Sequence, residues 1–290
     1  MLDTLADIAL IISLIGFVLF FIPTKFKNYF AVFAVIALEA GLLLKLPEFF
    51  AENNFFYPIL IIAALPIVYI TVKRLLNDDG TVKRFMYGVG IALTVYMPFA
   101  LIAPLGNWLI GTVVYWIRIV FDAVGFEYKM ADWNIFESAQ VIPGYSSGYL
   151  DEIILGCTGI TAIAILIGVV FLTKTNLIQR IGLLFLAIVP IYIINIFRNV
   201  FVIMSYFGQW FPDYPTGLGI DSLFTHPTIP GYTSFFWSHN VMCEIGAFIV
   251  IIVIALLLFK FTPGLVSSIR EIINVYVCDL KLIFGKKPKA

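Results

Sequence analysis

The stretch Ile181–Met204, IGLLFLAIVPIYIINIFRNVFVIM, decides the fold of this chain. It is long enough to cross the hydrocarbon core of a bilayer, which takes about 17–25 helical residues. Its one charged side chain is Arg198. Of the 290 residues, 61% are hydrophobic and 12% are charged, and the mean hydropathy is +1.02. This composition predicts a multi-pass membrane protein and excludes a soluble enzyme domain, a disordered segment and a cysteine-rich secreted module.

Six further apolar runs are of similar character, so we predict an all-α, polytopic bundle of about seven transmembrane helices. Internal prolines are tolerated in such helices where neighbours satisfy the freed carbonyl groups. The first run is preceded by acidic residues rather than the basic residues of a cleavable signal peptide, and we expect it to be retained. The predicted spans are Leu5–Ile22, Tyr29–Leu44, Tyr57–Val72, Phe85–Ala103, Ile153–Thr173, Ile181–Met204 and Val241–Phe259.

The distribution of basic residues predicts the orientation. The shorter run Trp108–Phe121 contains Arg118 and two tryptophans, and we expect it to form an amphipathic helix on the outer membrane surface. Fourteen lysines and arginines then fall on one side and three on the other, with Arg198 inside a span. Because Lys and Arg concentrate in short cytoplasmic loops, the N-terminus is expected outside and the C-terminus in the cytoplasm.

The chain is expected to form one transmembrane catalytic domain, residues 1–262, followed by a tail, residues 263–290. Apolar residues at helical spacing in the tail, followed by lysines, predict an amphipathic helix on the cytoplasmic surface. Two long segments, Pro104–Glu152 and Ser205–Ser238, are expected outside. The second has no Lys or Arg and is rich in Gly, Pro and aromatic residues, so it is either a cover over a substrate or an aromatic connector in the interface.

Three side chains capable of chemistry lie at a similar predicted depth near the outer face. Cys157 lies near the outer start of one predicted span, Arg198 lies near the outer end of the next, and His239 marks the outer entry of the last. A nearby cation favours the reactive thiolate of a cysteine, and an arginine also stabilises an oxyanion. Histidine transfers protons near neutral pH. Together these residues predict acyl transfer through a thioester.

Each of these residues also has a structural interpretation. Cys157 lies among glycines that favour helix packing, Arg198 is close enough to a helix end to reach the headgroups, and His239 fits an interfacial anchor. Cys243 lies one helical turn after His239 and would form a second Cys/His pair, but deeper in the hydrocarbon. We therefore rank Cys243 behind Cys157 as the nucleophile.

Cys157, His239 and Cys243 also form a conceivable metal site, although their sequence spacing is not that of known zinc motifs. Neither a His-Glu-x-x-His motif nor a Walker-type loop is present in the sequence. We therefore expect no metal, no cofactor and no nucleic-acid partner.

Cys157-Thr158-Gly159-Ile160, Arg198-Asn199-Val200 and His239-Asn240, in this order and spacing, resemble the signature of the archaeosortases, the archaeal relatives of bacterial exosortases. The resemblance covers Ile153–Phe259. It implies an intramembrane cysteine transpeptidase of the cell membrane whose site faces outside. Its partners would be secreted proteins with a C-terminal recognition motif, a transmembrane helix and a basic tail. The substrate's tail would be cut off and its new C-terminus passed to a membrane lipid.

By the same resemblance, Cys157 would be the nucleophile, Arg198 its electrostatic partner and His239 the third catalytic position. Two other functions remain open from the sequence. In an anion transporter or channel, Arg198 would bind the anion and Cys157 would only pack. A receptor-like seven-helix binding protein is favoured by the number of spans alone.

Overall fold

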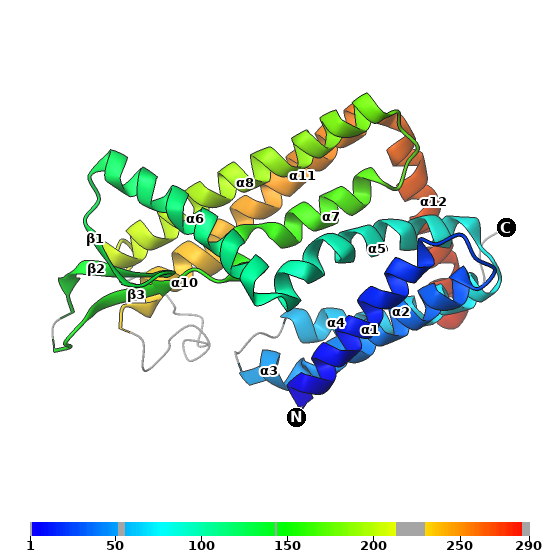
Figure 1. Cartoon of the computed structure of the whole chain (residues 1–290), viewed down its shortest axis with the longest axis horizontal. Coiled ribbons are helices and arrows are strands. Elements are labelled where there is room, and N and C mark those ends of the chain that lie inside the picture. The colour runs from blue at the N-terminus through cyan, green and yellow to red at the C-terminus, as the bar shows by residue number, and fades with distance from the viewer. Residues whose placement is uncertain (1, 52–55, 143, 213–229, 286–290) are drawn as a thin grey trace. The chain divides into compact units, whose positions relative to one another are not determined.

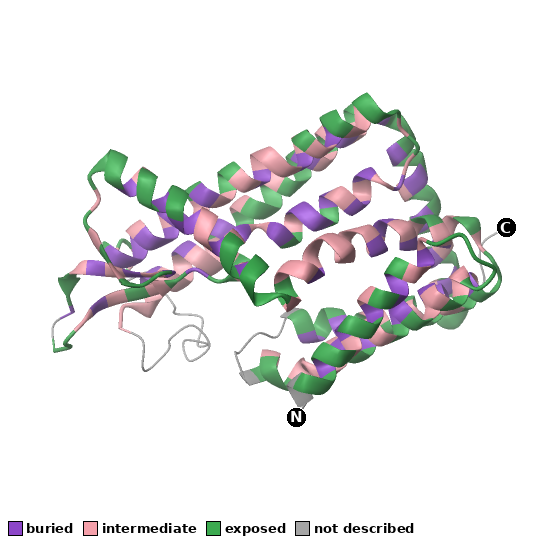
Figure 2. Cartoon of the chain, in the orientation of Figure 1, coloured by how far each residue is buried: buried purple, intermediate pink, exposed green. Residues whose placement is uncertain are grey.

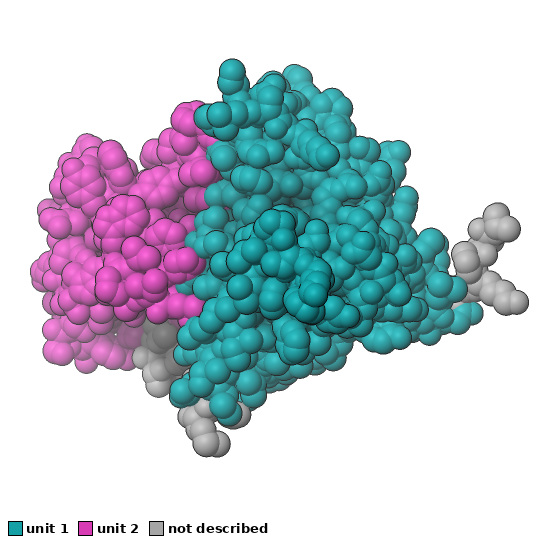
Figure 3. Space-filling model, turned by 45° about the vertical axis from the view of Figure 1, so that its right-hand side comes forward, with its two compact units in different colours: residues 1–97, 164–184, 258–290 teal, residues 98–163, 185–257 magenta. Residues whose placement is uncertain are grey.

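The computed structural model describes residues 2–51, 56–142, 144–212 and 230–285. These residues form mostly helices and one small antiparallel sheet (Figure 1). They divide into two compact units, which Figure 3 shows in different colours. Unit 1 comprises residues 1–97, 164–184 and 258–290, and unit 2 comprises residues 98–163 and 185–257.

Unit 1 is built on close helix packing. Its core contains the fully buried Phe17, Phe20 and Leu75. Glycine allows two of its helices to approach closely, since a Cβ at Gly16 would lie 2.9 Å from the Cβ of Ala34. Its helices are α1 (Leu2–Phe20), α2 (Lys27–Leu44), α3 (Leu46–Ala51), α4 (Phe56–Leu76), most of α5 (Gly80–Leu101) and α12 (Pro263–Ile283).

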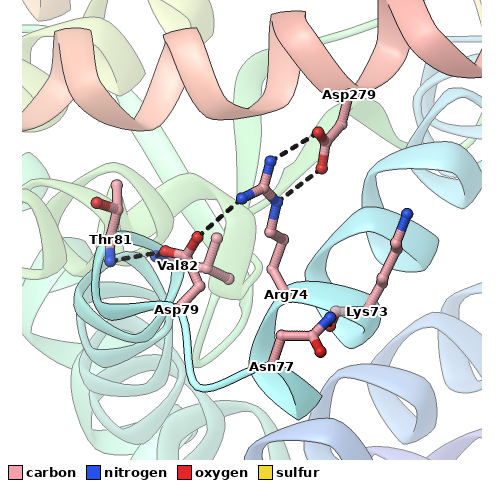
Figure 4. Close-up of polar contacts among 7 residues, drawn as sticks. All are labelled: Lys73, Arg74, Asn77, Asp79, Thr81, Val82 and Asp279. Atoms are coloured by element: carbon pink, nitrogen blue, oxygen red, sulfur yellow. Dashed lines mark hydrogen bonds and ion pairs between the residues drawn. The ribbon is translucent and has the colours of Figure 1, made fainter.

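A charged cluster fixes α12 to α4 within unit 1 (Figure 4). Arg74 donates hydrogen bonds to both carboxylate oxygens of Asp279, at 2.7 and 2.8 Å, and forms an ion pair with Asp79 at 3.1 Å. Asp79 Oδ1 also accepts hydrogen bonds from the backbone N–H groups of Thr81 and Val82. The guanidinium therefore meets two carboxylates, and one of them caps the start of α5.

Unit 2 contains α6 and the sheet. α6 (Ala103–Val124) has a proline in its first turn and ends at Gly125, whose φ of 70° is the left-handed conformation that glycine favours. The sheet is antiparallel, in the order β1 (Tyr128–Asp132), β2 (Ile135–Val141), β3 (Gly148–Glu152). Phe136 of β2 is fully buried and packs edge-on against Phe121 of α6, with ring centroids 5.7 Å apart.

The rest of unit 2 carries the predicted site residues. A short 3-10 helix, η1, follows the sheet, and a π-helix, η2, lies within a continuous helical run over residues 232–261. The elements are η1 (Leu155–Thr158), the start of α7 (Ile160–Val170), most of α8 (Leu177–Phe207), α10 (Tyr232–Phe236), η2 (Trp237–Cys243) and most of α11 (Glu244–Phe261).

The described residues include six helices that are long and apolar enough to cross a membrane. Many large apolar side chains on the long helices are exposed (Figure 2), including Phe33, Phe185 and Phe248 at 66% each. Such faces suit contact with lipid rather than water. The six helices are Lys27–Phe50, Tyr57–Leu76, Gly80–Leu101, Ala103–Val124, Leu177–Phe207 and Tyr232–Phe261.

The structure confirms a mostly helical chain with membrane-length helices, and it differs from the sequence predictions in three details. Within the predicted span Ile153–Thr173 the α-helix covers only the 11 residues Ile160–Val170. The residues before it connect β3 to η1 and form η1 itself. Trp108–Phe121 is part of the 22-residue α6, which has the length and apolarity of a membrane-crossing helix. The all-α prediction omitted the sheet, whose strands are short and partly polar. Orientation depended on Trp108–Phe121 not crossing and stays a prediction.

Two further expectations concern residues 205–238. His239 was expected just before the last span, but it lies inside the helical run over residues 232–261, one turn or more from its start. The predicted cover Ser205–Ser238 lies mostly outside the described residues, which omit 213–229. Its described ends include the end of α8 and the helix α10.

Candidate active site

Cys157 is positioned by the end of the sheet. The backbone N–H of Ile153 donates to the carbonyl of Asn134 at 2.9 Å, and the Asn134 side chain donates back to the carbonyl of Ile153 at 3.0 Å. After η1, Gly159 adopts a φ of 75°, and a Cβ there would lie 3.2 Å from the side chain of Asn195. The chain therefore turns sharply after Cys157 and lies against α8.

Two side-chain amides of α8 hold the backbone of Cys157. Asn195 and Asn199 both donate hydrogen bonds from Nδ2 to the Cys157 carbonyl oxygen, the second at 2.8 Å. They are four residues apart and therefore lie one above the other on the same helix face. These two hydrogen bonds fix the loop of Cys157 against the helix that carries Arg198.

Arg198 connects the other two predicted site residues. Its Nη2 lies 3.2 Å from His239 Nε2, and its Nη1 lies 3.4 Å from Asn199 Oδ1. Its positive charge also favours the thiolate of Cys157, whose carbonyl is bound by Asn199, the residue next to Arg198. The described residues place no carboxylate within ion-pair distance of Arg198. The structure thus brings Cys157, Arg198 and His239 into one cluster within unit 2.

The hydrogen bonds assign the protonation of His239. A guanidinium only donates, so His239 Nε2 acts as the acceptor toward Arg198. The ring proton then lies on Nδ1, which is 2.7 Å from Asn240 Oδ1. Phe235 stacks on the imidazole, with centroids 4.9 Å apart and planes 15° apart. His239 is therefore a neutral ring held in one orientation, on a π-helix of the kind often found at functional sites.

Asp151 is a second charged group at the site. It lies on β3, partly buried, and burial raises the pKa of its carboxyl to about 7, with Arg198 acting in the opposite direction. Burial also raises the pKa of the Cys157 thiol; the Asp151 charge adds to the rise, and Arg198 opposes it. The thiolate of Cys157 is therefore favoured when Asp151 is protonated and Arg198 acts alone.

Two curated proteins are similar to this chain over most of its length. Archaeosortase A of Natronomonas pharaonis is 24% identical over 240 residues, which cover 80% of this chain and 75% of that protein. Archaeosortase A of Haloferax volcanii is 24% identical over 250 residues, which cover 81% of this chain and 80% of that protein. These matches support the archaeosortase family for this chain. No family model and no solved structure matches it.

The archaeosortase relatives match far more of the chain than the C-terminal part in which the resemblance is visible by inspection. Their similarity extends over about four fifths of the residues of this chain. The resemblance seen at Cys157, Arg198 and His239 is consistent with this longer similarity. The catalytic roles of the three residues stay predictions.

Cys243, the other candidate nucleophile, lies in the same unit. Its side chain is buried and lines an apolar cavity of about 410 Å³ to which Arg198 also contributes. The cavity is bounded by residues of α7, α8 and the helical run that contains His239, including Gly159 and Gly246. Across the described residues there is no group of three or more His, Cys, Asp or Glu side chains placed to hold a metal ion.

Sequence reasoning missed Asp151, Asn195 and Asn199 as members of this site. Asp151 lies at the end of a strand that was not predicted, so its direction was unknown. The two asparagines did carry a signal, because two carboxamides four residues apart in an apolar span mark one polar helix face. That face is the one on which the Cys157 loop rests.

Proposed function

We propose that this protein is a cysteine transpeptidase that cleaves the C-terminal sorting signal of secreted proteins and transfers the new C-terminus to a membrane lipid. The observation that carries the proposal is the position of Arg198. Its guanidinium contacts His239 at 3.2 Å and acts on the thiol of Cys157, whose backbone two α8 asparagines hold. The similarity to proteins named archaeosortase A supports a sortase-like transpeptidase.

Cys157 is the nucleophile in this proposal. Its thiolate attacks the carbonyl carbon of the scissile peptide bond and forms a tetrahedral intermediate. The intermediate expels the amine of the sorting tail, which takes the proton that the thiol lost, and a thioester remains on Cys157. An amine or hydroxyl of a lipid headgroup then attacks the thioester, passes its proton to the departing sulfur and restores the thiol.

Arg198 stabilises negative charge at two stages. It favours the thiolate before attack and the oxyanion that forms on the substrate carbonyl. A guanidinium already neutralised by a carboxylate would serve this purpose poorly. The neighbours of Arg198 that accept hydrogen bonds in the described residues, His239 and Asn199, are uncharged, so the positive charge remains available to the substrate.

His239 is assigned a positioning role toward Arg198. Its Nε2 accepts from the guanidinium, and its Nδ1–H is fixed by Asn240, so the ring holds Arg198 in place without adding charge. The same Nε2 is a proton acceptor once Arg198 turns to the substrate oxyanion. It takes the proton that the Cys157 thiol loses, and the imidazolium formed in this way then gives that proton to the leaving amine.

The apolar cavity of about 410 Å³ beside Arg198 fits an apolar part of the reactants. Its lining is mostly apolar, with Asn195 and Arg198 as polar members, and a Cβ at Gly246 would meet nothing within 4 Å. We assign it to the first apolar residues of the sorting signal, which would place the scissile bond next to Arg198. The site is proposed to face the outside of the cell, as the resemblance to the archaeosortases implies.

Trapping of the thioester tests this proposal. Purified full-length protein in detergent is incubated with a synthetic peptide that carries the C-terminal tail of a secreted protein from the same cells. Mass spectrometry of the quenched protein is expected to find the peptide fragment on the tryptic fragment that contains Cys157. A fragment on Cys243, or none with any tail that is processed in the cells, would overturn the nucleophile assignment.

A matched pair of variants separates chemistry from folding. Cys157→Ala is expected to abolish release of the sorting tail in cells while the protein remains in the membrane. Cys243→Ala removes the other candidate nucleophile but keeps the cavity lining apolar at that position, and it is expected to leave release intact. Unchanged release by Cys157→Ala would exclude the proposed mechanism.

The anion-transport alternative rests on the same unpaired charge of Arg198. It predicts anion flux in liposomes that Arg198→Lys alters and Cys157→Ala leaves unchanged. Thioester formation on Cys157 would exclude it as the main function.

A further inference from the structure

A second cavity, in unit 1, has a lining that the transpeptidase proposal does not use. Its volume is about 690 Å³. It is bounded by the first turns of α2, α5, α8 and α12 and by the segment after α7, which all belong to unit 1. The charged side chains in its lining are all basic: Lys27, Lys83, Arg84, Lys174 and Arg180.

The carboxylates near this cavity neutralise only part of its charge. Lys83 pairs with Asp78 at 2.8 Å and Arg84 with Glu271 at 3.3 Å. Neither acid lines the cavity, and their side chains are 73% and 55% exposed. Within the described ranges, Lys27, Lys174 and Arg180 form no ion pair.

Arg180 is one of the cations whose charge is not balanced by a carboxylate in the described residues. Its guanidinium donates to Thr175 Oγ1 at 3.3 Å and lies over the ring of Phe171, with 4.8 Å to the centroid. Both partners are neutral, so they orient the guanidinium and leave its charge uncompensated. Five cations brought to one cavity repel one another, and a bound anion would relieve that repulsion.

The other lining groups match a phosphate on an apolar chain. Ser268 Oγ, which accepts from Arg84 at 3.3 Å, and Ser267 lie in the first two turns of α12, the end of a helix dipole that favours anions. Ile91, Phe171 and Leu172 form an apolar part of the same lining. The cavity lies at the first turns of α5 and α8, two membrane-length helices, where lipid headgroups are found.

We propose that this cavity binds a phosphate group, carried by the headgroup of an anionic membrane lipid or by a soluble phosphate compound. Arginine and lysine would contact its oxygens, with Arg84 and Arg180 able to bind in the two-pronged manner that suits phosphate. The lining of the cavity belongs to unit 1 and Cys157 to unit 2, so the proposal does not depend on catalysis. The positive-inside tendency accounts for basic residues at these helix ends, but it does not require them to line one cavity without an acid.

Native mass spectrometry of the purified full-length protein tests the proposal. The probes are phosphatidylglycerol, phosphatidylcholine with the same acyl chains, and inorganic phosphate. We expect retention of phosphatidylglycerol and at least tenfold weaker retention in the double variant Lys174→Gln/Arg180→Gln. The matched control is Arg118→Gln/Lys129→Gln, which removes two cations from elsewhere in the chain and should not change retention.

The outcomes separate the two sources of phosphate. Selective retention of phosphatidylglycerol that inorganic phosphate does not displace assigns a lipid, and displacement by millimolar phosphate assigns a soluble compound. Equal retention of phosphatidylglycerol and phosphatidylcholine, or undiminished retention in the double variant, would overturn the site.

A measurement on the unaltered protein covers the case in which the double variant does not fold. Lysine acetylation of the purified protein, read by mass spectrometry, should be slowed at Lys27 and Lys174 by the retained ligand. Lys129, which lies outside the cavity, serves as the internal control. No protection at Lys27 and Lys174 under conditions of retention would also overturn the proposal.

Discussion

Each compact unit contains an arginine within a cluster of polar side chains, and the two arginines have different partners. In unit 1, Arg74 meets the carboxylates of Asp279 and Asp79 at 2.7 to 3.1 Å. In unit 2, Arg198 meets an imidazole and a carboxamide at 3.2 and 3.4 Å. A guanidinium that is paired with carboxylates stabilises the packing of two helices. A guanidinium without such a partner can stabilise negative charge on a reacting group. We therefore assign Arg74 to stability and Arg198 to chemistry.

The largest expected effect on the rate of tail release comes from replacing Arg198, and Arg74 is replaced separately for comparison. Arg198→Gln removes the charge that favours the thiolate and the oxyanion, and the rate of tail release is expected to fall by about 10²–10³. Arg74→Gln, studied as the matched control, should leave the rate of tail release per folded molecule within about twofold. The comparison would fail if Arg74→Gln reduced the rate as much as Arg198→Gln.

The free energy of unfolding should depend more on the Arg74 cluster than on Arg198. Asp279→Asn breaks the paired hydrogen bonds to Arg74 and is expected to lower the free energy of unfolding by about 1.5–3 kcal/mol, the range for hydrogen bonds to charged groups. Arg198→Gln should change stability much less, because no ion pair is lost. Thermal unfolding of both variants in the same detergent measures this difference. A larger loss for Arg198→Gln would mean that its cluster is structural.

The pKa values of Asp279 and Asp151 are shifted in opposite directions, so the two carboxyl groups should affect stability in opposite ways as the pH changes. Arg74 holds the pKa of Asp279 below its usual value, so this carboxylate stabilises the folded protein at neutral pH and loses that effect as the pH falls. Burial raises the pKa of Asp151 from 3.8 to about 7. Between these values the folded chain binds a proton that the unfolded chain has released, so stability falls as the pH rises.

Asp151→Asn removes this second dependence. The variant's melting temperature is expected to change less than that of the unaltered protein between pH 4 and pH 7. Its rate of tail release should also lose any change centred near pH 7 that Asp151 imposes on the Cys157 thiol. Identical pH profiles for the variant and the unaltered protein would remove Asp151 from the site.

Residue types and span order predicted much of this site from the sequence. Three ionisable groups near the same ends of successive apolar runs were expected to meet, and Cys157, Arg198 and His239 do lie in one cluster. The number of apolar runs also predicted a helical membrane protein, although the segment around Cys157 is a strand end and a 3-10 helix rather than a span.

The remaining features of the site depend on the direction in which side chains point, and the pattern of apolar residues does not indicate that direction. The run after His239 is apolar on every side, so its periodicity does not tell which face meets Arg198. The π-helix over Trp237–Cys243 alters that face further. The sheet has short strands without long apolar alternation, so Asp151 could not be placed.

The smallest effect concerns the amides that hold the Cys157 loop. Asn195→Ala or Asn199→Ala each removes one of two hydrogen bonds to the same carbonyl, and a single such bond contributes about 0.5–1.5 kcal/mol. Tail release is expected to fall by about 2- to 12-fold in each single variant, through the rate of thioester formation rather than substrate affinity. The double variant should lose more than the product of the two, because the remaining amide compensates in each single variant. Asn107→Ala, an amide of α6 that makes none of these bonds, is the control and should not slow release. Additive losses would show instead that the asparagines act independently, and that the Cys157 carbonyl is not their common target.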